Sequence, residues 1–306
     1  MRIATPSSTA RSSIITKGRE AMRIVASASF VVLASCATNR AADFDGRAAL
    51  SLVEKQVEMG PRHPGTAGHE AIQGWIASEL QDLAWETMAS SFPYQGVTLT
   101  NISGRLDGAA GPFIVLGAHY DTRPVADRDQ AHPDSPVPGA NDGGSGVAVL
   151  LELARVLPAR GLACDVQLAF FDGEDSGNLE GWEWAAGSRH FAGELTREPS
   201  AVVVVDMVGD RDLDLPMERT SSADLAAEIW QAAAERSLDA FRAEPGPSVL
   251  DDHTPFLARG WRAVDIIDMA YPFWHTTEDT LDKISAESLD QVGEALLAWL
   301  GTVCSK

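Results

Sequence analysis

The stretch DVQLAFFDGED (residues 165–175) is a run of mostly apolar residues that ends in three acids. Its first part is typical of a buried strand. Asp172, Glu174 and Asp175 then follow within four positions. Carboxylates so close together repel one another and resist transfer out of water, so they need a cation, a shared proton or open water beside them. The stretch therefore predicts a strand of a central sheet that ends at a polar site.

Apolar runs rich in β-branched residues alternate with helical periodicity along the rest of the chain. We expect strands at about 85–90, 98–105, 113–118, 166–171, 201–205 and 263–267, and helices at about 46–58, 67–83, 145–157, 223–237 and 286–303. This alternation predicts an α/β fold, a three-layer α/β/α sandwich with a central mixed, mostly parallel sheet. With no internal repeat or linker, residues 46–306 are expected to form one catalytic domain.

The N-terminal segment has the features of a secretory signal. Met22-Arg23, where Met22 is an alternative start, precedes the apolar run IVASASFVVLA, which is shorter than the roughly 20 residues that a membrane span needs. We therefore expect residues 1–35 to be a signal peptide. LASC (33–36) resembles the bacterial lipobox, which would lipidate Cys36 and make residues 36–45 a tether; the alternative is an ordinary signal with a chance cysteine. We expect an exported bacterial protein, periplasmic or in the cell envelope, anchored through Cys36.

The net charge limits the possible binding partners, and the cysteine spacing limits the possible metal sites. The formal charge of -20 disfavours a nucleic-acid partner, and we expect membrane contact only through a lipid on Cys36. Cys164 and Cys304, the cysteines that remain after Cys36, form no CxxC motif, which excludes a cysteine zinc site. In an oxidising compartment they could pair, or they could be two buried thiols.

Polar residues follow several of the predicted strands, and ligands bind beyond the carboxyl ends of strands in such sheets. These residues are His119, Asp142 at the start of a helix, Glu174 with Asp175, Asp206, and His275. Imidazole and carboxylate groups are ligands that zinc accepts, with an open position in catalytic sites. Taken singly, His119 could be a core histidine, Asp142 a helix cap and Asp206 a turn residue. Together they predict a metal site.

Other catalytic patterns are absent from the sequence. There is no GxSxG, no HExxH and no phosphate-binding glycine motif. We expect the remaining histidines, namely His63, His69, His132 and His190, to be surface or loop residues. We expect NLEGWEWAAGSRHF (178–191) to be a loop leading into a helix. One of its tryptophans could line a pocket, but we favour core packing for them.

Six motifs in order resemble the superfamily of zinc aminopeptidases and glutaminyl-peptide cyclotransferases (peptidase M28-like). They are GAHYDTRP (117–124), PGANDGGSGVAVLLELA (138–154), FFDGED (170–175), VVDMVG (204–209), DDHTPFLARG (251–260) and YPFWHTT (271–277). TRPVADRD (122–129), Asp251 and Trp274 are most similar to zinc-type bacterial glutaminyl cyclases. The resemblance covers nearly the whole chain after the signal.

This resemblance implies a role for each matching residue. Asp142, Asp175 and His275 would bind the catalytic zinc, and Glu174 would be the general acid and base. Asp206 and Asp251 would orient the substrate amide, and Trp274 would form an apolar wall. Many relatives have glutamate at the position of Asp175. The implied reaction converts the N-terminal glutamine of a peptide to pyroglutamate and releases ammonia.

The resemblance leaves two other functions open. In a di-zinc aminopeptidase, His119 and Asp206 would bind a second zinc, Asp142 would bridge the two ions, and the enzyme would hydrolyse N-terminal residues from peptides with a free N-terminus. A non-catalytic zinc-binding lipoprotein is a remote alternative.

Overall fold

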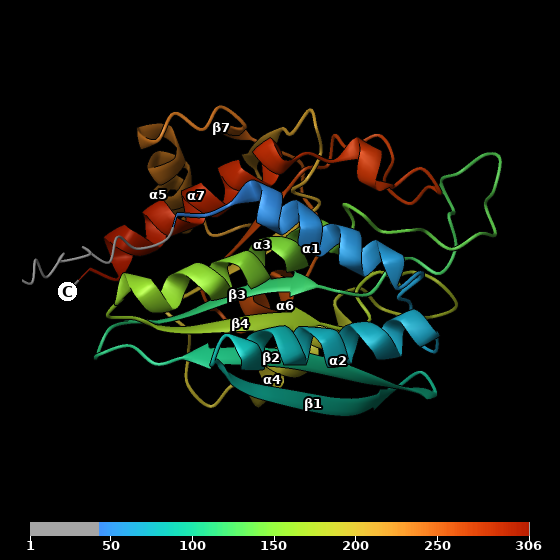
Figure 1. Ribbon diagram of the computed structural model, residues 1–306, viewed down its shortest axis with the longest axis horizontal. Coiled ribbons are helices and arrows are strands. Elements are labelled where there is room, and N and C mark those ends of the chain that lie inside the picture. The colour runs from blue at the N-terminus through green and yellow to red at the C-terminus, as the bar shows by residue number, and fades with distance from the viewer. Residues whose placement is uncertain (1–42, 306) are drawn as a thin grey trace, which may run out of the picture. The chain divides into compact units, whose positions relative to one another are not determined.

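The computed structural model describes residues 43–305 (Figure 1). The predicted signal peptide, Met22 and Cys36 lie outside the described residues. None of the helices within residues 43–305 is long and apolar enough to cross a membrane.

The centre of the fold is a six-stranded sheet in the order β1-β2-β4-β3-β5-β8. Its strands are β1 (Glu86–Tyr94), β2 (Val97–Leu106), β3 (Phe113–His119), β4 (Asp165–Phe171), β5 (Ala201–Asp206) and β8 (Ala263–Ile267). β3, β4, β5 and β8 run parallel to one another, whereas β1 and β2 form an antiparallel hairpin whose strand β2 pairs antiparallel with β4. The hairpin turns at Gln95 and Gly96, both with positive φ (46° and 84°), as tight hairpin turns require.

Helices cover both faces of this sheet. They are α1 (Gly46–Glu58), α2 (Ala67–Asp82), α3 (Gly144–Val156), α4 (Ala186–Glu194), α5 (Ala223–Glu235), α6 (Thr254–Ala258) and α7 (Ala286–Val303). Alternate residues of β3 separate the two layers: Leu116 belongs to the core shared with α1, α2, α3, α5 and α7, while Val115 packs with residues of α4 and α6. Figure 1 shows α2 and α3 in front of the strands. Helix α3 is buried on nearly every side, which explains why its segment VAVLLELA is apolar at every position except Glu152.

The predicted three-layer α/β/α architecture is confirmed. The six predicted strands and five predicted helices correspond to the central sheet and to α1, α2, α3, α5 and α7. The short helix α6 and the strands β6 (Leu215–Met217) and β7 (Phe241–Pro245), which form a separate two-stranded sheet, were not predicted. The 3-10 helices η1 (Leu157–Arg160) and η2 (Leu281–Lys283) were not predicted either. Four of the five residues of β7 are exposed, so it lacks the alternation that marks a half-buried strand.

The two ends of the described chain are attached to the core. Phe44 is buried beside Gly293 of α7, and Asp45 caps α1 by accepting hydrogen bonds from the backbone N–H groups of Arg47 and Ala48. The ordered fold thus includes two residues that were expected to belong to the tether. At the other end, Cys304 forms a disulfide with Cys164, just before β4, so the two cysteines are paired.

Candidate metal centre and active site

The predicted site residues come together at one edge of the central sheet. His119 is the last residue of β3 and Asp206 the last of β5, while Glu174 and Asp175 follow β4. These three strands are parallel, so their carboxyl ends meet at the same edge. Gly173, at the turn after β4, has φ +73°, and a Cβ there would lie 2.6 Å from Leu99. Only glycine allows the backbone to turn there and deliver the two acids.

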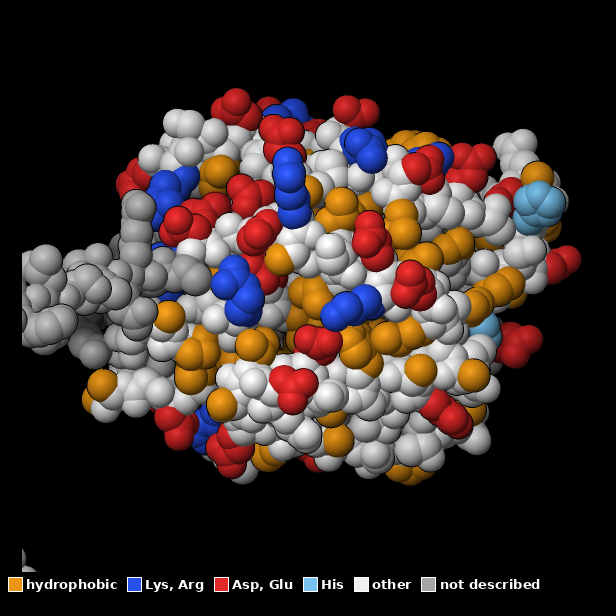
Figure 2. All heavy atoms as spheres, in the orientation of Figure 1, with side chains coloured by type: hydrophobic (Ala, Val, Ile, Leu, Met, Phe, Trp, Pro, Cys, Tyr) orange, Lys and Arg blue, Asp and Glu red, His pale blue; other side chains and the backbone are white. Residues whose placement is uncertain are grey.

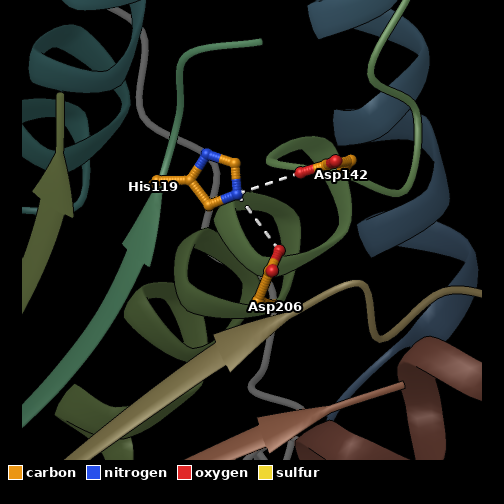
Figure 3. Close-up of side chains that lie close together, drawn as sticks. All are labelled: His119, Asp142 and Asp206. Carbon is orange, nitrogen blue, oxygen red and sulfur yellow. Dashed lines mark hydrogen bonds and ion pairs between the residues drawn. The ribbon is translucent and has the colours of Figure 1, made fainter. Parts of the chain in front are cut away.

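Asp142 lies between two groups of possible metal ligands. In the first, His119 Nε2 is 3.2 Å from Asp142 Oδ1 and 3.1 Å from Asp206 Oδ1 (Figure 3). In the second, His275 Nε2 is 3.1 Å from Asp175 Oδ1 and 3.8 Å from Asp142 Oδ2. Within each group, one ligand atom per residue lies within 4.8 Å of the others. The structure therefore brings Asp142, Asp175 and His275 close enough to share one ion.

The environment of these carboxylates fits a bound cation. Asp142 Oδ2 and Asp175 Oδ2 are buried, and no donor from the described part of the chain makes a hydrogen bond to either. Burial and the nearby charge of Asp142 raise the pKa of Asp175 to about 6. Burial likewise raises the pKa of Asp206 to about 7, although His119 opposes the shift. Two carboxylates and one imidazole suit zinc, whereas calcium takes six to eight oxygen ligands.

Two further carboxylates hold the ligand loops in place. Asp121 accepts hydrogen bonds from the backbone N–H groups of Glu174 and Asp175, each at 3.1 Å. Asp279 accepts from the N–H groups of Asn141 at 2.8 Å and Asp142 at 3.1 Å. Neither was predicted as a site residue. Both stand beside predicted ligands, in HYD and in HTTED, but their role depends on contacts with distant backbone groups.

Glu174 lines a cavity of about 340 Å³ next to the ligands. Asp206, Asp251 and Trp274, to which the resemblance assigns substrate contacts, also line it. Burial raises the pKa of Glu174 well above its usual value, and the charge of Asp251 adds to the shift. Burial also raises the pKa of Asp251. A carboxyl group with a raised pKa can both accept and donate a proton near neutral pH.

Trp184 corrects one expectation from the sequence. It lines the cavity instead of the core, and its ring stacks on the imidazole of His275, with centroids 6.3 Å apart and planes at 19°. Gly177 makes room for it, because a Cβ at this position would lie 2.2 Å from the indole. Trp184 and Trp274 thus both contribute apolar surface to the cavity beside the metal ligands.

His69 and Asp172 correct two further expectations. His69 is buried in α2 instead of lying at the surface, and its Nε2 is 2.8 Å from Asp172 Oδ1. The backbone N–H of Thr100 donates to Asp172 Oδ2 at 2.7 Å. Burial alone would lower the pKa of His69, but the hydrogen bond and charge of Asp172 raise it. The charge of Asp172 is therefore compensated by His69. Of the three clustered acids, only Glu174 and Asp175 face the site.

Comparison with protein-family models places residues 101–300 in peptidase family M28. The chain belongs to peptidase family M28. This match includes every predicted ligand and Glu174. One solved neighbour is named a Zn-dependent exopeptidase, which agrees with the ligand set described above.

Proteins similar to this chain are named either as glutaminyl cyclases or as exopeptidases. The chain is 28% identical over 282 residues to a glutaminyl-peptide cyclotransferase of Drosophila melanogaster, covering 76% of this chain and 74% of the relative. It is 31% identical to a solved glutaminyl cyclase of Porphyromonas gingivalis, with a TM-score of 0.79 over 85% of this chain and 99% of the other. A solved Zn-dependent exopeptidase of Parabacteroides distasonis is 28% identical, with a TM-score of 0.80 over 87% of this chain and all of the other.

Proposed function

We propose that this protein is a zinc-dependent glutaminyl-peptide cyclotransferase. It converts the N-terminal glutamine of a peptide to pyroglutamate with release of ammonia. The observation that carries the proposal is the position of Glu174, a buried acid with a raised pKa, in a small cavity between the metal ligands and two tryptophans. The similarity to named glutaminyl cyclases supports it.

Asp142, Asp175 and His275 would hold one zinc ion. When bound there, zinc would act as a Lewis acid on the γ-carbonyl of the glutamine. On this proposal, His119 and Asp206 do not bind metal and keep the hydrogen bond that joins them at 3.1 Å.

The chain's own residues would then move one proton and orient the substrate. In the reaction, the α-nitrogen forms a bond to the γ-carboxamide carbon, and the bond from that carbon to the amide nitrogen breaks. Glu174 takes the proton that the α-amine loses and gives it to the departing nitrogen, which leaves as ammonia. Asp206 and Asp251 orient the amide, and Trp274 covers the side chain of the glutamine. Holding the amine against the γ-carbon in this way draws on the proximity effect, worth up to about 7–11 kcal/mol.

The alternative function is a di-zinc aminopeptidase. One observation favours it: His119, Asp142 and Asp206 form a second group whose ligand atoms also lie within 4.8 Å of one another. With both groups occupied, Asp142 would bridge two ions and Glu174 would take a proton from the attacking water.

Mass spectrometry of two dipeptides separates the two functions. After incubation with Gln-Ala, a cyclase yields a product that has lost ammonia and kept both residues, and it leaves Leu-Ala unchanged. An aminopeptidase releases free leucine from Leu-Ala. Measuring zinc per chain gives an independent readout, because about one tightly bound ion is expected for the cyclase and about two for the peptidase. Release of leucine without any ammonia from Gln-Ala would contradict the proposal.

The proposal includes export from the cytoplasm, with an anchor at Cys36. Its support is the signal-like composition of residues 1–35 and the disulfide between Cys164 and Cys304, a bond that persists mainly in oxidising compartments. The peptide substrates would then be extracytoplasmic.

A further inference from the structure

A segment with no role so far, residues 123–129 (RPVADRD), lies against the segment that carries His275. The backbone N–H of Arg128 donates to the carbonyl of His275 at 3.3 Å, and its guanidinium lies 3.8 Å from the centre of the Trp274 ring. Asp129 accepts a hydrogen bond from the backbone N–H of Thr277 at 3.1 Å. We call residues 123–129 the strap, because they contact three of the four positions from 274 to 277.

The strap holds a strained residue. His275 has a φ of +57°, in the left-handed region that costs a non-glycine residue roughly 1–2 kcal/mol. Such a conformation persists only where the surroundings enforce it. The contacts of Arg128 and Asp129 with this segment help to hold the backbone of His275 in this conformation.

Asp127 contacts the imidazole of His275 itself. Asp127 Oδ1 is 3.2 Å from His275 Nδ1, while His275 Nε2 on the far side of the ring is 3.1 Å from Asp175 Oδ1. When a carboxylate accepts the proton of Nδ1, the lone pair of Nε2 is free for a metal, and the ring is fixed in orientation. The contact of Asp127 thus places a carboxylate beside Nδ1 and leaves Nε2 as the nitrogen that faces the ligand group.

Arg123 keeps Asp127 in position and ties it to the rest of the site. Its Nε and Nη2 donate to the two carboxylate oxygens of Asp127 at 3.0 and 2.8 Å. Its Nη1 donates to the backbone carbonyls of Asp175 at 3.1 Å and Gly177 at 2.8 Å, and its guanidinium lies 5.3 Å from the centre of the Trp184 ring. One buried arginine therefore connects the orienting carboxylate, a second ligand and a wall of the cavity.

We propose that Asp127 is a positioning residue for the metal centre: it fixes the His275 imidazole with Nε2 toward Asp142 and Asp175, and Arg123 holds Asp127 for this purpose. The inference rests on the zinc site of the proposed function and adds a determinant of zinc affinity outside the ligands. Loss of such an outer partner typically weakens metal binding 10–100-fold.

The test measures zinc affinity and stability separately. Zinc-free wild type, D127A and D127N are titrated with zinc against a chromophoric chelator, and their thermal unfolding is recorded without metal. D134A is the matched control, because Asp134 is an exposed acid of the same loop. We expect about 10–100-fold weaker zinc binding in D127A, a smaller loss in D127N, which keeps an acceptor oxygen, and wild-type affinity in D134A. The zinc-free melting temperature of D127N should stay near that of wild type, because this variant keeps an acceptor oxygen for Arg123 and the side chain at position 127 is 41% exposed.

Each outcome decides between the inference and its alternatives. Wild-type zinc affinity in D127A overturns the inference, and if D127A does not fold, wild-type affinity in D127N does so. A loss of zinc-free stability in D127A or D127N large enough to account for its weaker binding would assign Asp127 a purely structural role. Failure of the wild-type protein to bind zinc would instead contradict the proposed function itself.

Discussion

Glu174 is the residue whose chemistry is most sharply testable. Replacement by glutamine keeps the shape and removes the group that moves the proton, so we expect Glu174→Gln to lower kcat on Gln-Ala by about 10²–10⁴-fold. Zinc content should stay that of wild type, because Asp142, Asp175 and His275 are unchanged. Ammonia release and bound zinc are the two measurements. Glu180→Gln, the same change in an exposed position of the following loop, is the control. Undiminished turnover in Glu174→Gln would remove Glu174 from the mechanism.

The metal ligands could be predicted from the sequence, but their hydrogen-bond partners could not. His119, Asp142, Asp175 and Asp206 were predictable because each stands at or close to a strand end or a helix start, where local sequence reveals geometry. His275 lies in the loop after β8 and was predicted from the motif YPFWHTT. The partners that compensate or orient them were not. The hydrogen bonds of Asp279 with Asn141 and of Asp172 with His69 join residues 138 and 103 positions apart. No local pattern marks such pairs, since their spacing depends on how the whole sheet is assembled.

The loop after β6 depends on one buried acid for its conformation. Glu218 accepts hydrogen bonds from the backbone N–H groups of Thr220 at 2.9 Å, Ser221 at 2.7 Å and Val249 at 3.0 Å, and His253 Nε2 lies 3.4 Å away. Val249 lines the cavity, so this acid connects β6 to a wall of the site. Burial opposes ionisation, but His253 and the backbone donors outweigh it and hold the pKa of Glu218 well below its usual value.

The depressed pKa of Glu218 predicts how stability depends on pH. A carboxyl group whose pKa is lower in the folded state stabilises the fold above its unfolded pKa of about 4.3, and this contribution disappears as the pH falls. We therefore expect Glu218→Gln to lower the free energy of unfolding most near pH 6–7, and its difference from wild type to shrink below about pH 4. Urea unfolding across this range measures the effect. Glu54→Gln, at an exposed position of α1, should show no such trend. A difference that grows toward acid pH would contradict the assignment.

The disulfide joins the end of α7 to the start of β4. It closes a loop between cysteines 140 positions apart, and cross-links of this kind typically contribute about 2–4 kcal/mol by restricting the unfolded chain. We expect replacement of both Cys164 and Cys304 by alanine to lower the free energy of unfolding by this order. Urea unfolding with and without reductant provides the control: reductant should destabilise the wild type toward the variant and leave the variant unchanged. Equal stability of both proteins without reductant would show that the cross-link contributes nothing.

The elements themselves differ in how well sequence predicts them. β5 consists of AVVVVD, a run of four β-branched residues that ends in an acid, and α1 and α7 carry helical periodicity over 13 and 18 residues. These long or strongly patterned segments were predicted to within a few residues. β6 has three residues and α6 five, too few to show any period, and β7 is mostly exposed. Such elements form because neighbouring segments provide their partners.

At the scale of the whole molecule, the negative charge of the chain is not gathered into one patch on the face that Figure 2 shows. Figure 2 shows acidic side chains scattered among basic and apolar ones over the visible face, with no single acidic patch. The formal charge of -20 gives a general preference against polyanions, and this face shows no acidic docking site. The strongest concentration of acids lies inside, where Asp142, Glu174, Asp175, Asp206 and Asp251 are all buried around the cavity.

This internal concentration of acids predicts that zinc stabilises the entire fold. Without a cation, Asp142 and Asp175 keep carboxylate oxygens that are buried and that no donor within residues 43–305 reaches. An ion bound there would connect the loops after β3, β4 and β8, a set of ligands that only the folded chain brings together. A ligand at 100 times its dissociation constant adds about 2.7 kcal/mol to the free energy of unfolding.

Chelation is therefore expected to lower the melting temperature of the wild-type protein, and added zinc to restore it together with activity. His275→Ala removes one ligand, so its melting temperature should respond much less to either treatment. Differential scanning calorimetry with a chelator or with zinc measures both proteins. An unchanged wild-type melting temperature after proven removal of the metal would mean that the buried carboxylates are already compensated by shared protons, and the ligand assignment of Asp142 and Asp175 would fail.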